Sequence, residues 1–242
     1  LPTWADVIGY EDKEPRVVDK MRTGYPRFFF HPLIHQVRTA LEPKTGRDVL
    51  PFADQAAATK CAALTSGQAV QVDGLWAAYF PQKNLPVARA FWQHAGRIFS
   101  SRAAEDWLAT RRLAAPDPAL EQTLRDRLSS WSGAPATNIS LHPSGMAAIF
   151  TAFEAVTARR PDRRTVMFGF PYTDTLKILS KFGHGVEFFP RGDAADLARL
   201  ATLLEQEEIA GLFCEFPSNP LLRTPDLPAL HELAARHGVP VT

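Results

Sequence analysis

The chain has 242 residues, with 27 lysines and arginines against 26 aspartates and glutamates, so its formal net charge is +1. This even balance argues against general nucleic-acid binding, which needs an excess of basic residues. The composition, 45% hydrophobic and 22% charged, is ordinary for a globular protein with a core. Cys61 and Cys214 are too few for a disulfide scaffold, and the sequence contains neither a recognisable signal peptide nor an apolar run of about 18 residues. We therefore expect a cytoplasmic protein with no membrane span and no nucleic-acid partner.

The first half of the chain has an irregular pattern. Thr3, with Asp6 three residues later, is typical of a helix N-cap, and Pro15 can open a second short helix. The sequence further predicts an aromatic segment packed on a core at residues 24–30, a helix over 52–66, one or two strands over 71–80, and no single element over 90–108. We therefore expect residues 1–116 to form an irregular N-terminal extension and arm.

From Asp117 onward, strand and helix patterns alternate. Asp117 is a predicted N-cap with Pro118 at the first helical position, and Gly133 is the predicted stop of this helix. Strands are predicted over residues 137–142, 165–170, 186–189 and 209–215, helices over 144–159, 173–182, 194–205 and 226–237, and a further strand from Val239. Apolar strands that alternate with amphipathic helices indicate a mostly parallel sheet with helices on both faces. We therefore expect residues 117–242 to form an α/β domain.

In such sheets, ligands bind at the carboxyl ends of the strands, so the loops after the predicted strands are the place to look for a site. Ser144, Gly145 and Met146 follow the first predicted strand and open a helix. The unpaired N–H groups at a helix N-terminus attract a phosphate, and a glycine there permits close approach. A plain serine N-cap is the alternative interpretation. The sequence has neither a dinucleotide-binding nor a P-loop signature at this place.

Two further loops carry candidate ligand-binding residues. Tyr172 follows the second predicted strand, where its ring could stack on a flat cofactor; a surface or interface tyrosine is the alternative. Asn219 follows the fourth strand and lies between Pro217 and Pro220, which favour a defined loop. Its amide can both donate and accept hydrogen bonds, and a structural turn is the alternative.

One histidine pair has the spacing of a metal site. His31 and His35 are four residues apart, as in some zinc sites. Pro32 interrupts the helix that would align them, and no third ligand is evident. We therefore predict no metal site.

Three motifs occur in order at the predicted strand ends. They are Ser-Gly-Met at residues 144–146, Tyr-Thr-Asp-Thr at 172–175, and a segment at 215–227 that begins Glu-Phe-Pro-Ser-Asn-Pro. Together they resemble the Cys/Met-metabolism branch of the pyridoxal-phosphate enzymes, typified by cystathionine γ-synthase, and the aromatic segment 24–28 resembles the members with a long N-terminal extension. The resemblance implies an incomplete fold-type-I large domain, as in aspartate aminotransferase, with residues 117–242 as its first half.

The resemblance also implies a cofactor, pyridoxal 5'-phosphate, and residues that bind it. The backbone N–H groups of Gly145 and Met146, beside Ser144, match the donors to the cofactor phosphate. Tyr172 matches the residue that stacks on the pyridine ring. Asn219 matches the amide near the phenolic oxygen of that ring.

A segment of the first half adds a possible contact between subunits. Residues 93–102 resemble the part of the family that contains Tyr-Ser-Arg. Arg102 matches the arginine that reaches the cofactor phosphate of the partner subunit, a role that suits a guanidinium. Ser100 stands where the family usually has the tyrosine, so that second phosphate contact is not implied here. Glu215 matches an acidic residue that we expect to hold local structure.

The family needs two more residues for its chemistry, an aspartate at the pyridine nitrogen and a lysine that forms the Schiff base. The resemblance places both past Thr242, together with a small C-terminal domain. Lys177 and Lys181 lie on a predicted helix face and are expected to be solvated. We therefore expect no catalytic residue in this chain, no activity from it alone, and a longer parent polypeptide.

The resemblance implies that the parent protein is a transferase of trans-sulfuration and methionine biosynthesis. The implied reaction is γ-replacement on O-acyl-L-homoserine by a thiol such as cysteine. A cystathionine or methionine γ-lyase, an enzyme of specialised metabolism that forms a C–C bond by γ-replacement, and a non-catalytic fragment or partner are the alternatives. A small amino-acid substrate and a homodimer or homotetramer are implied as partners.

Overall fold

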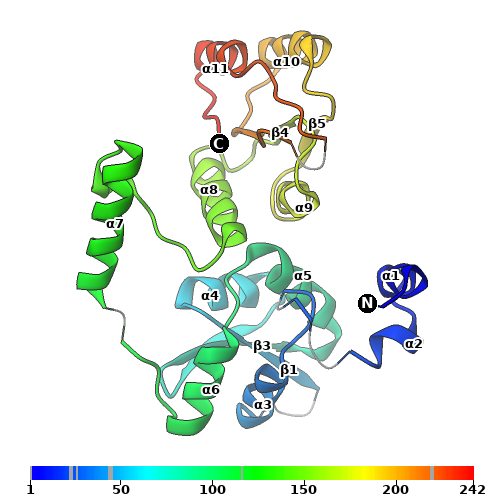
Figure 1. Ribbon diagram of the computed structural model, residues 1–242, viewed down its shortest axis with the longest axis vertical. Helices are drawn as coiled ribbons and strands as arrows, with labels where there is room; N and C mark the ends of the chain where they lie inside the picture. The colour runs from blue at the N-terminus through cyan, green and yellow to red at the C-terminus, as the bar shows by residue number, and fades with distance from the viewer. Residues whose placement is uncertain (1, 22–23, 26, 43–45, 116, 219–220) are drawn as a thin grey trace. The chain divides into compact units, whose positions relative to one another are not determined.

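The computed structural model describes residues 2–21, 24–25, 27–42, 46–115, 117–218 and 221–242. The chain divides into two compact units (Figure 1). Unit 1 consists of Leu1–Gln93 and Arg97–Ile139, and unit 2 consists of His94–Gly96 and Ser140–Thr242.

Unit 1 contains a three-stranded antiparallel sheet and most of the helices of the first half of the chain. Its elements are α1 (Trp4–Glu11), α2 (Pro15–Val18), α3 (Pro32–Ala40), β1 (Arg47–Phe52), α4 (Gln55–Leu64), β2 (Gln68–Val72), β3 (Leu75–Pro81), η1 (Gln82–Asn84), α5 (Leu85–Ala95, whose last two residues belong to unit 2), α6 (Ser101–Thr110), α7 (Pro118–Ser132) and η2 (Ala136–Asn138). The strand order is β1-β3-β2.

Local sequence signals explain several of these elements. Thr3 and Asp6 form a capping box at the start of α1. Asp73 and Gly74, both with positive φ, form the two-residue turn that joins β2 to β3, which is why the predicted strand region divides into a hairpin. Asp117 caps α7, and Gly133 ends it in the left-handed conformation, as predicted.

Within residues 47–110 the structure confirms the helix predicted over 52–66, as α4, and the strands predicted over 71–80, and it adds elements that the sequence pattern did not place. Helix α4 covers one face of the sheet, and α3 and α6 lie on the other (Figure 1). The core between them is built from large aromatic side chains that are fully buried: Phe52, Phe80, Phe91, Trp92 and Trp107. Strand β1 and helices α5 and α6 were not predicted, because a short strand and aromatic-rich helices have weak periodicity and long-range packing stabilises them.

Unit 2 contains a parallel sheet and confirms the α/β class predicted for the second half. Its elements are α8 (Gly145–Arg159), β4 (Thr165–Phe168), α9 (Thr173–Phe182), β5 (Val186–Phe189), α10 (Ala194–Gln206), β6 (Leu212–Cys214) and α11 (Leu227–Arg236). The strand order is β5-β4-β6, and both pairings are parallel. The backbone of residues 240–242 pairs with β6, also in parallel, so the strand expected from Val239 does begin to form.

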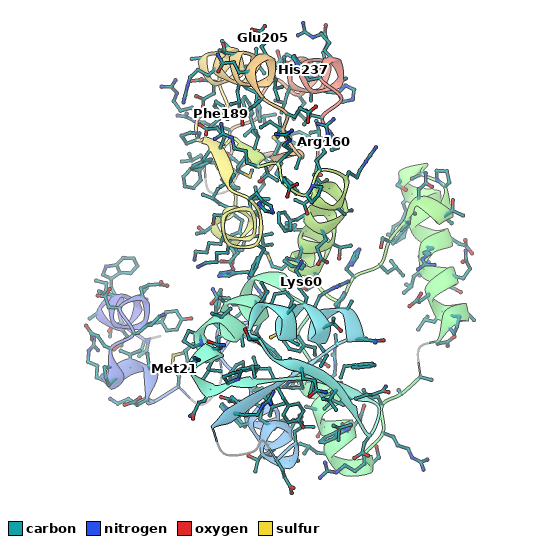
Figure 2. All side chains as sticks on the ribbon, turned by 180° about the vertical axis from the view of Figure 1, so that it is seen from behind. Met21, Lys60, Arg160, Phe189, Glu205 and His237 are labelled. Atoms are coloured by element: carbon teal, nitrogen blue, oxygen red, sulfur yellow. The ribbon has the colours of Figure 1, made fainter. Side chains whose placement is uncertain are left out.

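Helices cover both faces of the parallel sheet, as predicted. Helices α10 and α11 lie on one face, and α8 and α9 lie on the other (Figure 1). On the first face, Phe168 of β4 and Leu212 of β6 pack with Leu200 of α10 and Leu230 of α11. Figure 2 marks Phe189 at the end of β5, which contributes to the same cluster.

One predicted strand is wrong. Residues 137–142 form no strand, and the segment begins instead with the short 3-10 turn η2. The backbone N–H groups of Asn138 and Ile139 donate to the carbonyls of Pro135 and Ala136 within that turn. Because these donors are used locally and the segment is only partly buried, its alternating pattern does not become a sheet strand.

Candidate functional site

The N-terminus of α8 is one half of the candidate site. Ser144 is its N-cap, and the Ser144 hydroxyl accepts a hydrogen bond from the backbone N–H of Ala147 at 3.1 Å. The same hydroxyl donates to the carbonyl oxygen of Gly96 at 3.1 Å. Its single proton is therefore already engaged, and Ser144 both ends the loop and anchors a segment from the first half of the chain.

Gly145, the first residue of α8, faces open space. A Cβ added at Gly145 would meet no atom within 4 Å. The N–H groups of Gly145 and Met146 belong to the first turn, where a helix has no acceptors of its own. Since α8 is 15 residues long, its dipole adds a partial positive charge at this end. This open helix end with its unused donors fits an anionic group such as a phosphate.

Tyr172 lies in the loop between β4 and α9, as the sequence indicated. Its side chain is partly exposed, and Tyr172 is the N-cap residue of α9. Its backbone N–H donates to the carboxylate of Glu215 at 2.7 Å. Glu215 directly follows β6, so this bond joins the carboxyl ends of two neighbouring strands. Glu215 therefore holds local structure in the way expected from the sequence.

A short segment from the first half of the chain, His94–Gly96, contacts the starts of α8 and α9 within unit 2. The Gly96 carbonyl is bonded to Ser144 at the start of α8. His94 Nδ1 lies 3.3 Å from Asp174 Oδ1 in the first turn of α9. Because only Ala95 separates the two contacting residues, the starts of α8 and α9 lie near each other. The structure thus brings Ser144, Gly145 and Met146 to the same end of unit 2 as the turn that carries Tyr172.

Gly96 permits this close approach because it has no side chain. It has a φ of +67°, which favours glycine. A Cβ added there would lie 2.7 Å from Ala147 N and 2.8 Å from Ser144 Oγ. His94 and Gly96 lie in the segment that resembles the family, but the sequence indicated no role for either residue. No local pattern could show that they contact helices so far away in the sequence.

Asn219, the predicted amide, lies outside the described residues. The described part of this loop is organised by Ser218, which is 2% exposed. The Ser218 backbone N–H donates to the carbonyl of Arg223 at 2.9 Å, and its hydroxyl accepts from the Arg223 N–H at 3.0 Å. Ser218 is thus a structural residue of this loop, a role that the sequence analysis did not predict.

Arg102 belongs to unit 1, where it lies in the first turn of α6. Its side chain is exposed, and it forms no ion pair with any residue that the structure describes. Ser100 is the N-cap of α6 and accepts a hydrogen bond from the backbone N–H of Ala103 at 3.1 Å. This capping role gives a physical reason for a serine where the resemblance leads one to expect a tyrosine.

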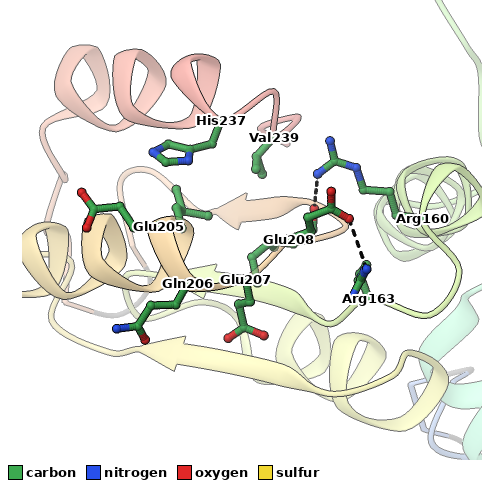
Figure 3. Close-up of a pocket in the computed structure, with 10 residues that line it drawn as sticks. Arg160, Arg163, Glu205, Gln206, Glu207, Glu208, His237 and Val239 are labelled. Carbon is green, nitrogen blue, oxygen red and sulfur yellow. Dashed lines mark hydrogen bonds and ion pairs between the residues drawn. The ribbon is translucent and has the colours of Figure 1, made fainter.

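A cavity of about 420 Å³ lies at the opposite end of the unit 2 sheet (Figure 3). Its walls come from segments that lead into β4, β6 and the strand beginning at Val239, so it is at the amino ends of the strands. Arg160 donates to the carbonyls of Ile209 and Gly238, and Arg163 pairs with Glu208. Figure 2 shows Arg160, Glu205 and His237 within this unit. Because both arginines already have partners in the fold, we assign this cavity no ligand.

The described part of the chain contains no group of three or more potential metal ligands. His31 instead caps α3 by accepting from the backbone N–H of Leu33, and His35 packs edge-on against Phe30. None of the helices that the structure describes is long and apolar enough to cross a membrane.

Comparison with known proteins identifies similar enzymes. The chain is 34% identical to L-2-amino-4-chloropent-4-enoate dechlorinase/desaturase of Streptantibioticus cattleyicolor, over 98% of this chain and 52% of that protein. It is 29% identical to a cystathionine gamma-synthase-like enzyme of Amanita muscaria, over 98% of this chain and 56% of that protein. It is 26% identical to cystathionine gamma-synthase of Saccharomyces cerevisiae, over 97% of this chain and 61% of that protein. The chain thus spans 52% to 61% of these relatives, and no protein-family model matches it.

Proposed function

Because the chain is similar over 97% to 98% of its length to cystathionine gamma-synthases and cystathionine gamma-synthase-like enzymes, we propose that the protein that contains it belongs to their family and is a pyridoxal-phosphate-dependent enzyme acting at the γ-carbon of an amino acid. The observation that supports this proposal best is the proximity of two features in unit 2. An open helix N-terminus at Gly145 lies near the turn that carries the partly exposed ring of Tyr172. A flat cofactor with a phosphate needs both features.

The proposed cofactor contacts follow from this arrangement. The N–H groups of Gly145 and Met146 would bind the phosphate, with Ser144 fixing the start of the helix. The Tyr172 ring would lie against the pyridine ring, and the Asn219 amide would approach the phenolic oxygen. Arg102, with its exposed guanidinium, would reach the phosphate of a partner subunit. Pyridoxal phosphate, when bound, supplies an electron sink for the carbanions formed at the substrate.

The proposal extends to the architecture of the whole protein. The parallel sheet with helices on both faces is compatible with the first half of a fold-type-I large domain. We propose that the protein assembles as a homodimer or homotetramer, since the role of Arg102 needs a second subunit. The aspartate and lysine that complete the chemistry would belong to the remainder of the protein, as would the small C-terminal domain.

For the reaction, we propose γ-replacement on O-acyl-L-homoserine by a thiol such as cysteine. A second candidate is γ-elimination, and one comparison favours it. The name of the Streptantibioticus relative describes the loss of chlorine from C4 of its substrate and the formation of an unsaturated product. Loss of a γ-substituent is common to both reactions, and they differ in whether a nucleophile then adds. An enzyme that forms a C–C bond would be a γ-replacement enzyme whose nucleophile is a carbon atom in place of a thiol.

The test uses the full-length protein purified with pyridoxal phosphate. It is incubated with O-acetyl- or O-succinyl-homoserine, with and without cysteine, and the products are identified by mass spectrometry. Cystathionine formed only with cysteine supports replacement, whereas a 2-oxo acid and ammonia formed without cysteine support elimination. A protein that neither retains the cofactor nor consumes either ester would contradict the proposal and favour a non-catalytic partner.

The role of Tyr172 has its own test. Tyr172→Ala removes the aromatic face and is expected to weaken cofactor binding about tenfold, a typical loss for one stacking contact. Tyr172→Phe keeps the ring and serves as the matched control. Equal cofactor affinity in both variants would show that the ring does not stack on the cofactor.

A further inference from the structure

His94 and Asp174 form a buried polar contact in unit 2. Nδ1 of His94 and Oδ1 of Asp174 lie 3.3 Å apart, and both side chains are 4% exposed. On the solvent side, Lys177 Nζ lies 3.7 Å from the same carboxylate oxygen of Asp174. Burying a carboxylate is costly unless partners compensate for its lost hydration. A contact of this kind is a weak source of stability, which points to a more specific role for the pair.

The position of Asp174 suggests that role. Asp174 lies in the first turn of α9, two residues after Tyr172. Within this turn the N–H of Thr175 donates to the carbonyl of Tyr172 at 3.0 Å, and Tyr172 provides no side-chain cap. The start of α9 therefore depends on other contacts to hold it in place.

Two long-range contacts hold this turn. On the sheet side, Glu215 accepts a hydrogen bond from the N–H of Tyr172. On the helix side, His94 contacts Asp174. The segment that carries His94 is itself anchored, because the Gly96 carbonyl accepts a hydrogen bond from the Ser144 hydroxyl and Gly96 packs against the first turn of α8. Tyr172 is 38% exposed, and the backbone of this turn fixes the point from which its ring extends.

We propose that His94 is a positioning residue, which through Asp174 fixes the first turn of α9 and so holds the Tyr172 ring in place for the cofactor. This inference rests on the proposed function, since it needs Tyr172 to stack on the pyridine ring. It adds a residue from the first half of the chain to the site. The segment 94–96 thus sets the spacing between the phosphate-binding end of α8 and the stacking residue.

The experiment measures cofactor binding by the full-length protein. The dissociation constant of pyridoxal phosphate is determined by fluorescence quenching, and the visible circular dichroism of the bound cofactor reports how its ring is held. His94→Leu removes the polar contact and is expected to raise the dissociation constant about tenfold and to reduce the dichroism. His94→Asn places an amide nitrogen near the position of Nδ1 and is expected to restore most of the affinity.

A double-mutant cycle separates positioning of Tyr172 from a general structural effect. In a Tyr172→Ala background, His94→Leu is expected to change the dissociation constant by less than about twofold, because its effect acts through the missing ring. The loss of folding stability, measured on the apo-protein, is expected to be the same in both backgrounds. If His94→Leu does not fold, His94→Gln, which moves the polar group to the Nε2 position, replaces it in the cycle.

The outcomes separate this inference from the proposed function. Equal losses of affinity with and without Tyr172, or no loss in either background, would overturn the positioning role while the wild-type protein still binds cofactor and turns over. A wild-type protein that binds no pyridoxal phosphate would overturn the proposed function and this inference with it. A loss that is confined to proteins with Tyr172, and is rescued by asparagine, supports the inference.

Discussion

The carboxylate of Glu215 accepts a hydrogen bond from the backbone N–H of Tyr172 at 2.7 Å, although the two residues are 43 positions apart in the sequence. The bond connects the loop after β6 to the loop after β4, and these strands are neighbours in the parallel sheet. Glu215 and Tyr172 therefore hold the ends of two neighbouring strands together. Both residues were singled out from the sequence, but their contact was not.

Removing the carboxylate of Glu215 tests this connection. Glu215→Ala is expected to lower the free energy of unfolding by about 1 kcal/mol, because a bond from an N–H to a charged acceptor is lost at a partly exposed position. Cofactor binding by the full-length protein should weaken as well. Glu215→Gln keeps an acceptor oxygen and should lose less in both measurements. Urea unfolding and cofactor titration provide the data, and identical behaviour of the two variants would contradict the prediction.

Gly96 and Gly133 offer a matched pair of glycines with positive φ. Gly96→Ala combines a strained backbone with contacts of 2.7 to 2.8 Å to α8, whereas an added Cβ at Gly133 meets no atom within 4 Å. We expect Gly133→Ala to cost about 1 kcal/mol from backbone strain alone. Gly96→Ala should cost about 1 to 3 kcal/mol more, from forced displacement of the helix start. Urea denaturation measures both, and equal losses would show that Gly96 does not pack closely on α8.

Arg164 connects three elements at the amino end of the unit 2 sheet. Its guanidinium pairs with Glu187 of β5 at 2.8 Å and with Glu207, which follows α10, and these bonds raise the pKa of Arg164, so it stays charged. All three side chains are about one third exposed. Arg164→Met should therefore destabilise the fold by about 1 kcal/mol, after allowance for solvent screening.

Arg163 is the matched control for this prediction. Its pair with Glu208 is mostly exposed, with side-chain exposures of 52% and 69%. Arg163→Met is expected to change the free energy of unfolding by less than about 0.5 kcal/mol. Thermal denaturation at low and high salt compares the two, and the Arg164 effect should shrink only in part at high salt because its pairs are partly buried. A larger loss of stability in Arg163→Met than in Arg164→Met would contradict the prediction that the partly buried pairs of Arg164 contribute more.

The two free cysteines differ in burial and should differ in reactivity. Burial raises the pKa of the Cys61 thiol to about 12, and burial together with the charge of Glu215 raises the pKa of Cys214 to about 11. Only the thiolate reacts with alkylating agents. At pH 8 we therefore expect iodoacetamide to modify Cys214 slowly and Cys61 more slowly still, with both reacting readily in denaturant. Peptide mapping by mass spectrometry gives the order, and faster labelling of Cys61 would contradict it.

The Cys61 thiol predicts the direction in which the free energy of unfolding changes with pH. The pKa of an unfolded cysteine is about 8.5, whereas burial raises the pKa of folded Cys61 to about 12. Above the unfolded pKa the unfolded state binds fewer protons than the folded state, so stability falls as pH rises. Cys61→Ala should flatten this decline between about pH 9 and 11, when unfolding is followed across that range. An unchanged slope would exclude Cys61 as its cause.

Helix ends and the alternation of unit 2 could be predicted from the sequence because they depend on nearby residues. Asp117 caps α7 as predicted, and Asp226, where a helix was predicted to begin, caps α11. Three of the four strands predicted between residues 137 and 215 form within their predicted ranges. The motif residues at 144–146, 172–175 and 215–227 carry the resemblance to the pyridoxal-phosphate enzymes, and the similar enzymes found by comparison agree with it. These features follow from residue chemistry and spacing over a few positions, which a single sequence displays directly.

The tertiary structure decided what depends on residues far apart in the chain. Residues 137–142 have a strand pattern but form a local turn, and β1, α5 and α6 form where the sequence pattern predicted no single element. The Gly96 carbonyl meets the Ser144 hydroxyl across 48 positions. His94 and Glu215 reach the turn of Tyr172 from separate segments. Sequence alone therefore predicted the helix ends, the α/β alternation and the residues proposed to bind the cofactor, whereas packing decided which side chains hold those residues in place, because such contacts leave no local pattern.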